Sequence, residues 1–177
     1  MWAIVKDNEI TETFSNLKGL VIDNIQYSRN IFSFRWSEAE RNAIGVYTIV
    51  HDNSNKKDQT CYTNTDISYT FADGKVTASY GTATPKELSG LKTEKKRIIK
   101  QQASDLLTPT DWHVIKATEV ESYSVPGAIT TYRADIRTAS NDMETLIDNC
   151  STVDELADLY IYTDGSRPLG EFPTLEI

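Results

Sequence analysis

The chain has 177 residues and a formal net charge of −8, and 39% of its residues are hydrophobic and 25% charged. This composition is typical of a folded protein with one domain or two small ones, and it argues against extensive disorder. The acidic balance disfavours binding to nucleic acid and to anionic membranes, and without a run of 18 apolar residues we expect no membrane span.

The first 83 residues indicate a small β-rich domain. Short apolar segments between turn residues such as Asp7-Asn8 are typical of strands. The predicted strands cover residues 2–6, 10–14, 20–25, 30–36 and 46–50. A short helix is predicted over residues 37–43, because Ser37 and Glu40 form a capping box and Gly45 suits the helix end.

A further hairpin is predicted over residues 67–80. Apolar and polar residues alternate on both sides of Asp73-Gly74, a pair that accepts the positive φ of a tight turn. One face of this hairpin is apolar and aromatic, and the other is a ladder of hydroxyls. The ladder consists of Ser68, Thr70, Thr77 and Ser79. It fits a solvated sheet face, and it also fits a glycan-binding face.

Residues 84–162 indicate a helical module. Thr84, Pro85 and Glu87 are typical of a helix start, and an amphipathic helix is predicted from about Leu91 until Thr108-Pro109 stops it. The basic run at 95–97 is predicted to lie on the wet face of this helix, with the alternative of a binding patch. Three more helices are predicted from apolar residues at i, i+3, i+4 and i+7. They contain residues 129–136, 143–150 and 153–160.

Caps and turns set the predicted limits of these helices. Asn141 with Glu144 and Ser151 with Asp154 are predicted to start the last two helices. A short turn after Pro109 is predicted to bury Trp112. Residues 163–177 contain two prolines and two glycines, and they are predicted to form an extended tail laid over another surface or subunit. The sequence thus predicts an α+β fold: an N-terminal small antiparallel β domain with hairpins (1–83), a C-terminal small helical bundle (84–162) and the tail.

No arrangement of reactive residues predicts a chemistry. His51 and His113 are the only imidazoles, and neither lies at a recognisable catalytic or ligand spacing. Glycine-rich phosphate loops and clustered metal ligands are absent from the sequence. Cys61 and Cys150 lie in different halves and are predicted to be free thiols. We therefore expect no enzymatic activity, no cofactor and no metal.

Five stretches together cover most of the chain: RNIFSFRWSEAERNAIGVYTI, NTDISYTFADGKVTASYGTATPK, GLKTEKKRIIKQQASDLLTPTDWHVIKA, VPGAITTYRADIRTASNDMETLIDN and RPLGEFPTL. These stretches resemble a family of tailed-phage structural proteins that is common among phages of aquatic bacteria. The Thr110-Asp111-Trp112 segment and the later TTYRADIR also resemble the helical module of phage tail-fibre assembly and fibre-associated proteins. This resemblance implies no catalytic residues. Extra sequence that longer relatives carry between the two halves is replaced here by residues 81–90.

The resemblance implies a virion structural protein in or near the tail, fibre or collar, assembled in the bacterial host cytoplasm. Its expected partners are other phage structural proteins and further copies of itself. Trp2, Trp36 and Trp112 are candidate partner contacts, although each also fits a place in its own domain's core. Two alternatives remain: a tail-fibre assembly chaperone that is absent from the virion, and a glycan-binding adhesion module that uses Tyr62, Tyr69 and Tyr80.

Overall fold

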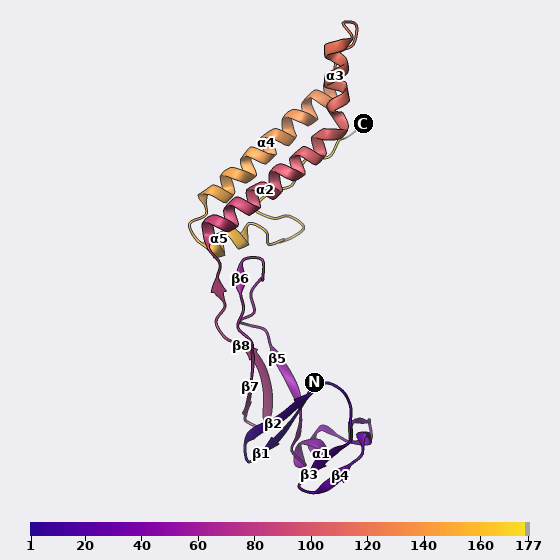
Figure 1. The fold of residues 1–177 in the computed structure, drawn as a ribbon, viewed down its shortest axis with the longest axis vertical. Helices are drawn as coiled ribbons and strands as arrows, with labels where there is room; N and C mark the ends of the chain where they lie inside the picture. The colour runs from indigo at the N-terminus through magenta and orange to yellow at the C-terminus, as the bar shows by residue number, and fades with distance from the viewer. Residues whose placement is uncertain (176–177) are drawn as a thin grey trace. The chain divides into compact units, whose positions relative to one another are not determined.

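The computed structural model describes residues 1–175, which fold as two compact units (Figure 1). The first unit is Met1–Thr84 and the second is Pro85–Ile177; the sequence placed this boundary one residue earlier, between 83 and 84. Strands dominate the first unit and helices the second, which confirms the predicted α+β fold class. Among the described residues, none of the helices is sufficiently long and apolar to cross a bilayer.

A five-stranded sheet forms the frame of the first unit. Its strand order is β2-β1-β5-β8-β7. The strands are β1 (Trp2–Lys6), β2 (Glu9–Phe14), β5 (Val46–Asp52), β7 (Ile67–Ala72) and β8 (Lys75–Tyr80). Neighbouring strands are antiparallel, as predicted, except β5 and β8, which pair in parallel. The reason is that the second strand of the β7–β8 hairpin, not the first, lies beside β5.

The predicted hairpin over 67–80 is confirmed. Asp73 and Gly74 have φ values of 51° and 71°, and β7 pairs with β8 from Ile67↔Tyr80 to Ala72↔Lys75. The turn between β1 and β2 has the same character, because Asp7 and Asn8 also have positive φ.

The two faces of this sheet bury different clusters. Along β1, Ala3 packs with Ile49, Val76 and Ala78 on one face, whereas Trp2 belongs to the cluster on the other face. That second cluster lies under β3 (Leu20–Ile22), β4 (Ile25–Tyr27), η1 (Arg29–Phe32) and α1 (Glu38–Ala43). Its buried members are Phe14, Leu20, Ile31 and Val46.

Two predicted strands of this region were wrong. Residues 20–25 form no single strand, because Asp23 and Asn24 turn the chain at positive φ between β3 and β4. The segment 30–36 begins with the 3-10 turn η1, which the Ser28 hydroxyl caps by accepting the Asn30 amide. The predicted capping box of Ser37 and Glu40 at α1 is confirmed.

Helix α2 (Leu88–Leu107) begins three residues before the predicted Leu91. Its N-cap is Glu87, whose carboxylate accepts the amides of Ser89 and Gly90, so Thr84 and Pro85 do not start the helix as predicted. Those two residues form the short strand β9 (Thr84–Pro85), which belongs with β6 (Tyr62–Thr63) to a two-stranded sheet.

The predicted helix starts at Asn141 and Ser151 also differ from the structure. Helix α4 (Gly127–Asn149) is one continuous helix of 23 residues through the predicted break at Asn141. Its apolar stripe stays in phase across that position, so the core-facing side is unbroken. Helix α5 (Val153–Asp158) has a capping box of Thr152 and Glu155, one residue after the predicted one. Helices α2 and α4 lie side by side and run in opposite directions (Figure 1).

The tail packs on its own helical unit. Leu169 is 2% exposed, and its amide donates to the Leu159 carbonyl at 3.0 Å. Further along, Phe172 and Leu175 pack against the clusters between α2 and α4. Figure 1 shows the yellow tail returning along this helix pair. The surface that the predicted tail covers is thus the hydrophobic core of its own helical unit, not another subunit. Residues 176 and 177 lie outside the described part of the chain.

Candidate functional site

The corner between α2 and the following α3 (Asp111–Glu119) is held by one arginine. The Arg133 side chain, on α4, is 11% exposed and pairs with the Asp111 carboxylate at 2.8 Å. It also donates to the Leu107 carbonyl at 3.0 Å and to the Thr110 hydroxyl at 2.5 Å. Thr110 itself is 4% exposed and ends the short turn η2 (Thr108–Thr110). This arrangement determines where α3 starts and how it leaves α2.

Much of the sequence motif that resembles fibre-assembly proteins is therefore structural. Thr110, Asp111 and Arg133 form the corner, and Tyr132 and Ile136 are buried in the cluster beside it. Packing and hydrogen bonding thus account for most of the motif.

Helix α3 lacks a buried side. Trp112 is 52% exposed, so the prediction that it is buried was wrong. Its ring lies beside His113 and Tyr123, and the Lys116 ammonium lies over the rings of Trp112 and Tyr123. Further apolar side chains lie exposed on the same segment. Together they form what we call the α3 surface: Trp112, Val114, Ile115 and Val120.

The other two tryptophans lie in the core of the first unit. The Trp2 ring packs against Phe32 with ring centres 4.7 Å apart, and Trp36 meets Tyr27 edge-on at 6.2 Å. Both are half-buried members of the cluster beneath α1. The structure thus places Trp112 alone of the three on an open surface.

The most exposed large apolar side chain of the first unit is Phe34. It is 95% exposed, in the loop between η1 and α1, and its neighbour Arg35 lies over the ring at 6.0 Å. Phe34 was not among the candidate residues predicted from the sequence, because residues 30–36 were predicted to form a strand. Ser28, a capping residue ahead of the segment, is the signal that could have indicated a helical turn instead.

The first unit also has an open groove of about 820 Å³. Strands β1 and β2 line one side and the β3–β4 hairpin the other, and a salt bridge of 2.6 Å between Lys6 and Asp23 joins them. Val21 and Ile25 are 68% and 55% exposed there. The lining therefore combines apolar side chains with charged ones.

The tyrosines named for glycan binding do not share an open face. Tyr62 is 4% exposed, and Tyr69 packs against the cluster of Ala3 and Ile49. The Tyr80 ring lies under the Lys56 ammonium at 5.6 Å. Sugar stacking needs an accessible ring face, which this set does not offer as a group.

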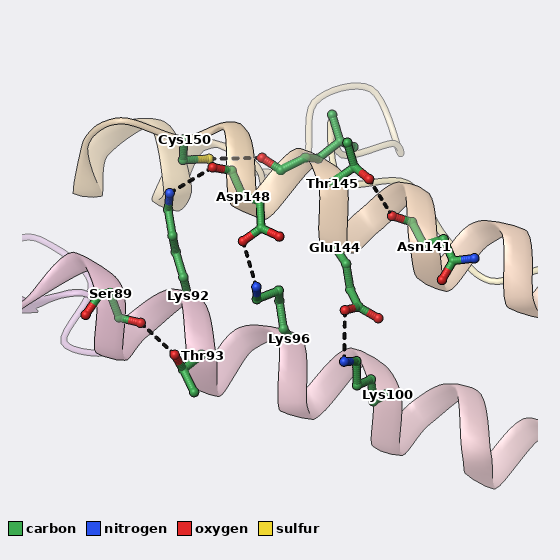
Figure 2. A network of polar contacts seen from close by, with 11 residues as sticks. Ser89, Lys92, Thr93, Lys96, Lys100, Asn141, Glu144, Thr145, Asp148 and Cys150 are labelled. Carbon is green, nitrogen blue, oxygen red and sulfur yellow. Dashed lines mark hydrogen bonds and ion pairs between the residues drawn. The ribbon is translucent and has the colours of Figure 1, made fainter.

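Lysines of α2 face carboxylates of α4 in a regular ladder (Figure 2). Lys96 pairs with Asp148 at 2.7 Å and Lys100 with Glu144 at 3.1 Å, while Lys92 donates to the Asp148 carbonyl at 2.9 Å. Positions four apart on two antiparallel helices meet in this way. Of the basic run, Lys96 thus faces α4, Arg97 pairs with Glu94, and Lys95 lies over the Tyr160 ring.

Several ionisable groups of the described residues cap helices or form ion pairs. Within residues 1–175, no three His, Cys, Asp or Glu side chains are grouped to hold a metal ion. The pKa of Glu87 is lowered by hydrogen bonds from the Gly90 and Ser89 amides, and that of Glu40 by those from Ser37. Burial raises the pKa of the Cys150 thiol. His113 accepts or donates a hydrogen bond at Tyr123.

No family model, no curated protein and no solved structure matches this chain. The exposed apolar side chains of the two units are the features of the structure that best fit a binding function.

Proposed function

We propose that this chain is a structural component of a tailed bacteriophage particle, in or near the tail, fibre or collar. It acts by protein–protein assembly and not by catalysis. The α3 surface is the observation that carries this proposal. A nine-residue helix without a buried side chain is marginally stable alone, and it gains stability when a partner covers its apolar residues.

Two further features support assembly. The corner around Arg133 fixes α3 in one direction, and a pre-ordered binding element loses less entropy when it docks. Trp112 is the type of residue that dominates contact energies at protein interfaces. The phage assignment itself is supported by the sequence stretches that resemble tailed-phage structural proteins. The partners we propose are other proteins of the particle and further copies of this chain.

Mass spectrometry of purified particles tests the proposal. We expect the wild-type chain in the particle, and we expect the double variant Trp112→Ser with Ile115→Ser to be depleted from it. Val50→Ser is the matched control, because Val50 is also 55% exposed but lies on β5. Absence of the wild-type chain from particles would overturn the proposal. If the chain were instead bound to fibre protein in infected-cell lysates, it would be an assembly chaperone.

A further inference from the structure

Phe34 has the character of an anchor for a neighbouring molecule. At 95% exposure its ring has almost no contact with its own unit beyond Arg35, whereas Phe14 and Phe32 are packed into the cluster nearby. The segment from Arg29 to Trp36 carries two arginines and no carboxylate. An aromatic ring beside a positive charge is thus presented on a chain whose net charge is −8.

The groove of the same unit is complementary to this anchor in size and charge. The groove is open and has a volume of about 820 Å³, which leaves room for an aromatic side chain. Its apolar lining includes the exposed Val21 and Ile25. Its charged lining consists of Lys6, Asp7, Glu12 and Asp23, which leaves a net negative charge.

One of these carboxylates forms no salt bridge. Asp23 pairs with Lys6 and Glu12 with Lys18, whereas Asp7 has no ion pair within 4 Å in the part of the chain that is described and interacts with Lys6 only electrostatically, over a longer distance. Arg35 likewise has no carboxylate partner among those residues. The groove lining does not include the Phe34 loop, so the two features are separate parts of the surface.

We propose that this chain self-associates by inserting Phe34 of one copy into the β1–β2/β3–β4 groove of another, with Arg35 beside Asp7. This inference deepens the proposed function, on which it rests, by naming a second copy as one partner. Apolar burial of the ring gives the affinity, and the opposite charges give the orientation. Because the anchor and the groove are different surfaces, such a contact adds copies head to tail unless a ring closes.

Analytical ultracentrifugation of the full chain tests this inference. Concentrations up to about 500 µM are needed, because a contact with a micromolar to submillimolar dissociation constant forms only at comparable protein concentrations. We expect concentration-dependent association for the wild type. Phe34→Ala should raise the dissociation constant by about 30-fold, as for a central anchor residue. Val21→Arg blocks the groove at a side chain that is already 68% exposed, so it should also give a monomer.

Mixing the two variants is the decisive step. Phe34→Ala keeps an intact groove and Val21→Arg keeps an intact anchor, so together they should form a one-to-one complex although each alone is monomeric. Asp7→Asn removes the proposed charge partner while keeping a residue type that accepts its φ of 53°, and should weaken association several-fold. Val50→Arg, at an exposed position outside the groove, is the control and should associate like the wild type.

A monomeric wild type, association that survives Phe34→Ala, or a mixture that stays monomeric would each overturn this inference. None of these results bears on whether the chain is in the particle. Conversely, a self-associating chain that is absent from purified particles would overturn the proposed function alone.

Discussion

Arg133→Ala should uncouple α3 from the α2–α4 pair. The variant loses two charged hydrogen bonds, to the Leu107 carbonyl and the Thr110 hydroxyl, and one ion pair with Asp111. Each hydrogen bond from this largely buried charged group contributes about 1.5 kcal/mol, and the ion pair contributes under about 1 kcal/mol because Asp111 is 51% exposed. We therefore expect the free energy of unfolding of the helical unit to fall by about 3 kcal/mol.

Urea unfolding followed by circular dichroism at the helix band measures this change. Arg137→Ala is the control, because the Arg137 side chain only donates to the Arg133 carbonyl on its own helix, and it should shift stability by less than about 0.5 kcal/mol. The loss of stability for Arg133→Lys should lie between the losses for Arg133→Ala and Arg137→Ala, since one ammonium cannot replace the forked guanidinium. A loss below about 1 kcal/mol for Arg133→Ala would refute the idea that this residue holds the corner.

Three further outcomes are expected. Ile136→Ala should destabilise the helical unit by about 3 to 4 kcal/mol in thermal unfolding, because Ile136 is 0% exposed, whereas Ile115→Ala, at 55% exposure, should change it by under about 0.5 kcal/mol. Asp148→Asn should cost under about 1 kcal/mol at low salt and less at high salt, because the ladder to Lys96 is partly exposed. The pKa of Glu87 in the folded state lies below its ordinary value of 4.5, so the charged carboxylate stabilises the fold fully above pH 4.5. This stabilisation is lost as the pH falls through the folded-state pKa. The difference in unfolding free energy between wild type and Glu87→Gln should therefore close over the same pH range, as denaturant titrations at each pH would measure.

Local patterns predicted those elements whose cause is local. The 67–80 hairpin and the α1 capping box depend on residues within a few positions of one another, so Asp73-Gly74 and Ser37 with Glu40 predict them directly. The order of the sheet is different. Whether β7 or β8 lies beside β5 depends on packing between distant segments, which alternation along one strand does not encode.

The wrong helix boundaries have a similar origin. Asn141 is a favourable cap in isolation, but the stripe from Ile129 to Ile147 stays in phase through it and packs against α2 as one surface. Burial of that stripe outweighs the cap, which contributes only about 1 kcal/mol. At α2, the Glu87 carboxylate takes the amides of Ser89 and Gly90, a cap that a rule based on Thr84 overlooks.

The candidate site was predicted least well. Sequence patterns identified aromatic residues but not which of them are covered, because coverage depends on segments that lie far apart in the chain. Trp2 is covered by η1 and α1, whereas Trp112 lies on a helix without a buried side chain. Phe34 lies in the segment 30–36, which was predicted to be a strand but begins with the 3-10 turn η1.

Exposure distinguishes the proposed role of these aromatic residues in assembly from a role in folding. A buried aromatic stabilises the native state directly, so its removal lowers both stability and binding. When the chain folds, Phe34 removes little of its surface from water, because it stays 95% exposed. Trp112 removes only part of its surface, because it stays 52% exposed. In the proposed assembly, contact with another molecule would complete their burial. Variants at these two positions that unfold the chain, instead of changing only its contacts, would contradict this interpretation.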